Sequence, residues 1–109
     1  MKLTLRARHV LLTPTLRDLI VRRLELAFSR VALEIRSVHC TITDINGPKG
    51  GPDKQVRLRV RGRSLGGLVV EHLGSDMLVT VSLAADRAER ALLRSLARRR
   101  TFAPPVFAI

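Results

Sequence analysis

Apolar residues recur with two different spacings in successive segments of this chain of 109 residues. The order of these segments limits the possible folds more than any other feature. In four segments apolar residues alternate with polar ones, a pattern typical of strands with one buried face. These segments are residues 2–8, 37–44, 55–61 and 68–73. The third segment is the most regular, whereas the alternation of the fourth is blurred, which leaves the direction of its side chains open.

Two other segments follow the helical period of about 3.6 residues. The first begins at Thr13-Pro14, where Thr13 can cap a helix and proline fits the first helical position. It predicts a helix over residues 14–30. The second follows Gly74-Ser75-Asp76, in which Ser75 or Asp76 is the expected cap. It predicts a helix from residue 76 to about residue 99.

The predicted order is therefore strand, helix, three strands, helix. A strand-helix-strand start favours a right-handed crossover with parallel strands, and the short later connections favour antiparallel pairs. Each helix has one apolar stripe, so both are expected to cover the same face of the sheet. We expect an α+β fold, a βαβββα two-layer sandwich with a four-stranded mixed sheet. We further expect one domain over residues 1–100 and a short tail over residues 101–109.

The charge of the chain points to a class of partner. It has 20 Lys and Arg against 9 Asp and Glu, a formal net charge of +11, while 46% of its residues are hydrophobic. That hydrophobic fraction supports a folded core and not a disordered basic tail. The positive charge favours a polyanion, either nucleic acid or an acidic membrane surface.

Several classes of protein are disfavoured. The apolar runs are far shorter than the roughly 20 residues of a membrane span, and the N-terminus does not resemble a signal peptide. The single cysteine, Cys40, cannot form an internal disulfide and fits a reducing cytoplasm. Trp and Tyr are absent and only three Phe occur, which disfavours base stacking. Recognition of backbone charge and shape is therefore expected.

The arginines of the second predicted helix are the first candidate RNA-binding residues. They fall in one sector of the helical wheel and span roughly 16 Å. They are Arg87, Arg90, Arg94 and Arg98. Because no acidic residue shares their sector, phosphate contact is favoured over a merely solvated face.

The outward positions of the strands are the second candidate set. Arginines occupy them in the third and first predicted strands. They are Arg57, Arg59 and Arg61, joined by Arg6 and Arg8 if the strands lie as proposed. The alternative is that these long side chains only keep an exposed sheet soluble.

No enzyme site is expected. His9, His39 and His72 lack the spacing of metal ligands. His39 and Cys40 are neighbours in a strand, so their side chains point to opposite faces and cannot form a nucleophilic pair. The glycine-rich residues 46–52 lack the ending of a nucleotide-phosphate loop and serve as either a hairpin or an RNA contact. We expect no cofactor, metal or small-molecule substrate.

Several short motifs occur in a specific order. They are His9-Val10, Thr13-Pro14-x-Leu16-Arg17, the loop Asn46-Gly-Pro-Lys-Gly-Gly-Pro-Asp53-Lys54, Gly66-Gly67, Asp76-Met77, and then Asp86-Arg87, Arg90 and Arg94. Together they resemble the ribosome hibernation-promoting factors. These proteins are also called ribosome-associated inhibitors or ribosomal subunit interface proteins, and formerly sigma-54 modulation proteins.

The resemblance implies a double-stranded-RNA-binding-like fold that binds the small ribosomal subunit near the decoding region. There it would overlap the sites of mRNA and tRNA and hold the ribosome inactive in stationary phase. Leu78-Val79-Thr80 departs from the aromatic and small residues that the family has after Asp-Met. The chain also lacks the C-terminal dimerisation domain of the long members, so a short form is expected.

These observations predict a non-enzymatic, cytoplasmic translation inhibitor whose partner is the small ribosomal subunit and its rRNA. Its oligomeric state, and whether it pairs ribosomes or only silences them, stay open. One alternative is a generic structured-RNA-binding module. Another is a protein that modulates a transcription factor through exposed Val69, Leu73 or the tail with Phe102 and Phe107, whose simpler role is packing or disorder.

Overall fold

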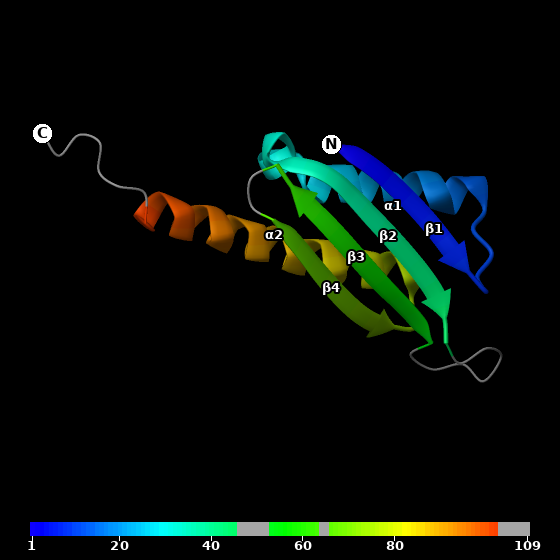
Figure 1. The fold of residues 1–109 in the computed structure, drawn as a ribbon. Helices are drawn as coiled ribbons and strands as arrows, with labels where there is room; N and C mark the ends of the chain where they lie inside the picture. The colour runs from blue at the N-terminus through cyan, green and yellow to red at the C-terminus, as the bar shows by residue number, and fades with distance from the viewer. Residues whose placement is uncertain (46–52, 64–65, 103–109) are drawn as a thin grey trace, which may run out of the picture.

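A computed structural model describes residues 1–45, 53–63 and 66–102, with side chains up to Arg98. Four strands form one sheet, and the two α-helices lie on one of its faces (Figure 1). The elements are β1 (Lys2–Arg8), α1 (Pro14–Ala27), a 3₁₀ helix η1 (Ser29–Glu34), β2 (Ile35–Asp44), β3 (Lys54–Gly62), β4 (Gly67–Gly74) and α2 (Met77–Phe102). The predicted α+β fold with a mixed sheet is confirmed.

The strands lie in the order β1-β2-β3-β4. β1 pairs with β2 in parallel, and the two later pairs are antiparallel. A parallel pair needs a crossover connection, which α1 provides. His9, at φ 56°, occupies the left-handed region just after β1, where the chain turns towards α1.

The first helix begins where the sequence predicts but ends earlier. The Thr13 hydroxyl accepts a hydrogen bond of 3.1 Å from the Leu16 amide, which confirms the cap. The predicted end at residue 30 is wrong, because α1 stops at Ala27 and the chain tightens into η1. In a 3₁₀ helix residues three apart lie on the same side, and this places both Phe28 and Val31 in the core.

The second helix begins as expected and extends to Phe102, slightly beyond the predicted end near residue 99. An Asp76 side-chain oxygen accepts a hydrogen bond of 2.9 Å from the Val79 amide and caps the helix. Thr80 and Val81 are β-branched and therefore weak helix formers, but both are buried. Tertiary packing thus supports the first turns of α2.

The core lies between the sheet and the helices. Val56, Leu58 and Val60 of β3 are fully buried, and α2 packs across β3 and β4. Ala84 and Ala88 are among the small residues that α2 buries, which lets the helix approach the sheet closely. The opposite face of the sheet has no covering element among the described residues, as Figure 1 shows. This open face and the outer surface of α2 are where the candidate site is found.

Candidate nucleic-acid interface

The outer face of α2 presents the first set of predicted residues. Arg87, Arg90, Arg94 and Arg98 are all exposed, as their spacing predicts. Within the described residues none of the four forms an ion pair; Arg98 donates only to the Ser95 hydroxyl, at 3.5 Å. The face therefore has uncompensated positive charge. Phosphate contact by these residues remains a prediction.

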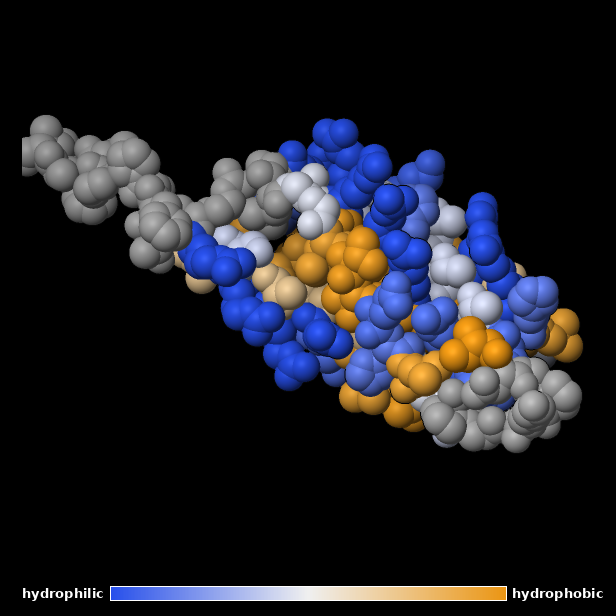
Figure 2. Space-filling view, turned by 60° about the horizontal axis from the view of Figure 1, so that its bottom comes forward, coloured by the Kyte–Doolittle hydropathy of each residue, from blue (hydrophilic) through white to orange (hydrophobic). Residues whose placement is uncertain are grey.

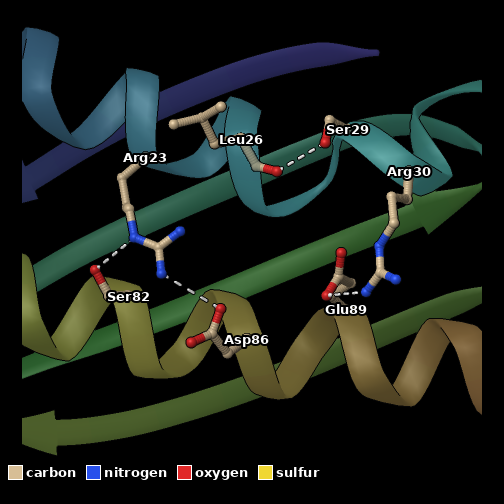
Figure 3. A network of polar contacts seen from close by, with 7 residues as sticks. All are labelled: Arg23, Leu26, Ser29, Arg30, Ser82, Asp86 and Glu89. Carbon is tan, nitrogen blue, oxygen red and sulfur yellow. Dashed lines mark hydrogen bonds and ion pairs between the residues drawn. The ribbon is translucent and has the colours of Figure 1, made fainter.

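The two acidic residues of α2 face the other way and pair with arginines near α1 (Figure 3). Asp86 lies 3.5 Å from Arg23, whose Nε also donates to the Ser82 hydroxyl at 3.0 Å. Glu89 lies 3.2 Å from Arg30 of η1. These pairs keep both carboxylates away from the arginine face. Sequence reasoning missed them, because the partners are about sixty residues apart.

The second predicted set lies on the open face of the sheet, but β1 and β3 are separated there by β2. The register aligns Arg6, Thr41 and Arg57 in one row across three strands. It aligns Thr4, His39 and Arg59 in the next row. A hollow of about 500 Å³ lies over these residues. The structure therefore brings Arg6, Arg57 and Arg59 together from two strands.

The remaining predicted residues lie outside this hollow. Arg61 lines a neighbouring hollow together with Arg59 and Arg36, which the sequence reasoning missed. A register irregularity between Ile35 and Ser37 interrupts the alternation at Arg36, so no strand pattern could place that side chain. Arg8 is exposed at the far end of β1 and lines none of the described hollows.

A groove along the edge of the sheet lies beside the arginine face of α2. Leu68, Val69, Val70 and Glu71 of β4 line it together with Arg87, Ala91 and Arg94 of α2. Val69 is 47% exposed and also borders the hollow of Arg59 and Arg61. Figure 2 looks onto this edge and shows hydrophilic side chains on both sides of a hydrophobic strip. A hydrophobic strip on β4 therefore separates the two basic surfaces at this edge.

Two carboxylates pair with a lysine next to the glycine-rich segment. The Lys54 amine lies 2.9 Å from Asp53 and 3.6 Å from Asp44. The hydrogen bond with Asp53 raises the pKa of Lys54. Lys54 is thus neutralised locally. Residues 46–52 and the tail after residue 102 lie outside the described residues, as does the side chain of Phe102.

His39 and Cys40 lie on opposite faces of the sheet, as the strand geometry predicts. His39 is exposed on the open face, whereas Cys40 is buried in the core. Burial raises the pKa of the Cys40 thiol to about 12, so the thiol stays protonated near neutral pH. In the described part of the chain, no three His, Cys, Asp or Glu side chains lie close enough to hold a metal ion. No described helix is both long and apolar enough to cross a membrane.

Comparisons with known proteins agree with this geometry. A family described as sigma 54 modulation protein / S30EA ribosomal protein matches residues 3–100. A structure of a ribosomal subunit interface protein from Coxiella burnetii is similar, with a TM-score of 0.71 and 23% identity. The match covers 89% of this chain and 99% of that one. The N-terminal domain of Thermus thermophilus Protein Y is also similar, with a TM-score of 0.69 and 20% identity over 86% of this chain and 98% of that one. A search of curated proteins found no match.

Proposed function

Because the chain belongs to the sigma 54 modulation protein / S30EA ribosomal protein family, we propose that it is a ribosome-associated translation inhibitor. It binds small-subunit rRNA through its basic side chains. Its folded body then blocks the path of mRNA and tRNA, which promotes ribosome hibernation in stationary phase or under stress.

The arginine face of α2 is the observation on which the rRNA contact rests. Four exposed arginines lie on one side of the helix, while Asp86 and Glu89 are paired with Arg23 and Arg30 on another. Guanidinium groups bind phosphate oxygens with two parallel hydrogen bonds. Phosphate contacts fix the position and orientation of a protein on RNA without reading its sequence. The rigid two-layer body behind α2 then excludes other molecules from the occupied site.

The salt dependence of binding to purified small subunits tests the electrostatic mechanism. If about six phosphates are neutralised, the slope of log affinity against log salt is expected near −4 to −5. A slope near −1 would contradict phosphate-dominated docking. A sucrose gradient of stationary-phase lysate tests the cellular role, because the protein is expected to sediment with ribosomal particles.

Competition separates ribosome recognition from generic RNA binding. Both functions use the same arginines, so affinity for a duplex alone does not discriminate. A ribosome-specific protein releases a labelled small subunit poorly when generic duplex RNA is added in excess. Ready displacement by such a duplex would favour a general structured-RNA-binding module.

A protein partner is the alternative that the apolar part of β4 favours. Val69 and Leu73 are each close to half exposed on the open face. Replacing Arg87, Arg90 and Arg94 together by Glu is expected to abolish association with small subunits. A role through the β4 side chains alone would survive that substitution, and the substituted protein would still bind its protein partner.

A further inference from the structure

The open face of the sheet has a trough along β2. Short side chains form its floor, because His39, Thr41 and Thr43 point outward from the strand between β1 and β3. Longer basic side chains form its walls. Arg6 and Arg8 project from β1, and Arg57, Arg59 and Arg61 project from β3. A hollow of about 500 Å³ forms part of this trough. It is lined by Thr4, Arg6, His39, Cys40, Thr41, Arg57 and Arg59.

The spacing of the strands sets the width of the trough. Adjacent strands lie about 4.8 Å apart, so the backbones of β1 and β3 are roughly 10 Å apart. Arg57 and Arg59 are two residues apart on the same face, or about 7 Å along the strand. From Lys2 to Arg8 the trough runs for about 20 Å. These dimensions fit one extended chain lying along β2, with guanidinium groups on both sides of it.

The charge in the trough is largely uncompensated. Among the described residues of the open face, Glu71 is the one carboxylate, and its oxygen lies 3.8 Å from Arg57 Nε. Arg6 and Arg59 form no ion pair within the described part of the chain. The hydroxyl of Thr41 on the floor can donate a hydrogen bond between the two walls. Donors therefore converge from three sides on whatever occupies the trough.

The strands present no Phe, Tyr or Trp side chain on the described open face for a base to stack on, and His39 is the one ring there. A ligand of this trough is therefore recognised through its anionic groups. We propose that the trough binds a single extended chain of phosphates and that recognition does not involve bases. Inorganic polyphosphate is the simplest such chain, and the backbone of an unpaired RNA strand is the other source. The site is separate from the arginine face of α2 and does not depend on ribosome binding.

Titration of inorganic polyphosphate into the full chain, followed by calorimetry, tests this site. Replacing Arg6, Arg57 and Arg59 by Gln is expected to weaken binding by at least about tenfold, because each lost charge-assisted hydrogen bond contributes about that much. The control variant replaces Arg22, Arg30 and Arg63 by Gln, which removes the same charge from exposed positions outside the trough. Equal weakening by both variants would overturn the proposal, because it would show attraction to net charge alone.

A second variant probes the floor without changing the charge. Thr41→Val keeps the shape and strand propensity of the side chain but removes its hydroxyl. We expect polyphosphate affinity to fall about three- to fivefold, as the loss of one hydrogen bond would produce. Unchanged affinity, with the arginine variant also unchanged, would overturn the proposal. Thermal unfolding of each variant confirms that the fold is intact.

Unpaired RNA distinguishes the two sources of the phosphate chain. Oligo-A and oligo-U are expected to compete with polyphosphate with affinities within about twofold of each other, because stacking does not contribute. Binding of RNA without any binding of polyphosphate would overturn the proposal. The two proposals can fail separately. If the trough variant bound polyphosphate as well as the natural chain, while the variant of Arg87, Arg90 and Arg94 lost small-subunit binding, this site would be rejected. The proposed function would then still stand.

Discussion

A single carboxylate, that of Glu71, lowers the positive electrostatic potential of the trough. It forms an exposed ion pair with Arg57 at 3.8 Å. Glu71→Gln frees that guanidinium, and we expect polyphosphate affinity to rise about two- to threefold at low salt and less at high salt. Competition binding at two salt concentrations measures the gain. Glu25→Gln, on the exposed side of α1, is the charge-matched control, and an equal gain there would contradict a local effect.

Cys40 links stability to pH. Burial raises the pKa of its thiol from 9.0 to about 12. Between these values the unfolded chain loses the thiol proton while the folded chain keeps it, so stability falls as pH rises. At about pH 10.5 this effect amounts to about 2 kcal/mol. Urea unfolding measures this effect as the fall in the free energy of unfolding between about pH 8 and pH 10.5. We expect that fall to be smaller in Cys40→Val than in the natural chain by about the same 2 kcal/mol.

The same burial predicts low reactivity of the native thiol. A thiol reagent should modify Cys40 slowly in the folded protein and readily after unfolding. If the pH dependence of Cys40→Val matched that of the natural chain, the thiol would not be the titrating group.

Single residues also show which parts of the site a sequence can predict. The exposure of Arg57 and Arg59 could be predicted, because both alternate strictly with buried residues. These are Val56, Leu58 and Val60, and the whole signal lies within seven residues. Convergence of Arg6 with Arg57 does not follow from any local signal. It depends on the order of three strands and on a register that is set by the whole sheet.

The junction between β4 and α2 is a tight contact between two elements. A Cβ at Gly74 would clash with the hydroxyl of Thr80, which is buried and donates to the Asp76 carbonyl. We expect Gly74→Ala to cost about 1–3 kcal/mol in thermal or urea unfolding. The double variant Gly74→Ala with Thr80→Ala should be closer in stability to Thr80→Ala alone. Additive losses would show that the clash is not the cause.

The elements that the sequence predicts well are those with local signals. All four strands were placed to within about two residues, because each alternates within itself. The end of α1 was predicted wrongly, since Phe28 and Val31 suit a helical stripe equally well as α-helix or as 3₁₀ helix. The pairing of Asp86 and Glu89 with α1 and η1 could not be predicted, because it requires the packing angle of two helices.

For the whole molecule, two arginine surfaces contribute nine of the 20 Lys and Arg behind the net charge of +11. Replacing Arg87, Arg90 and Arg94 by Gln is expected to reduce the salt slope of small-subunit binding by about 2–3, since each lost phosphate contact removes about 0.7–0.9. Affinity should fall together with the slope. Equilibrium sedimentation with purified subunits at several salt concentrations measures both quantities.

The triple variant Arg17→Gln, Arg22→Gln and Arg63→Gln, at exposed positions away from α2, is the control for this measurement. It removes the same charge but is expected to change the slope by less than about 1. Equal slopes for the two variants would mean that long-range attraction, and not contact with phosphate, determines binding.

The position of α2 at the end of the described chain also affects how the protein is made. Figure 1 shows α1 behind β1 and β2, so that half of the sheet can be covered early in synthesis. β3 and β4 are covered by α2, which is synthesised after both. The apolar side chains of β3 therefore remain exposed to solvent until the chain as far as Leu92 has emerged from the translating ribosome. The core of the domain therefore closes only after α2 has been synthesised.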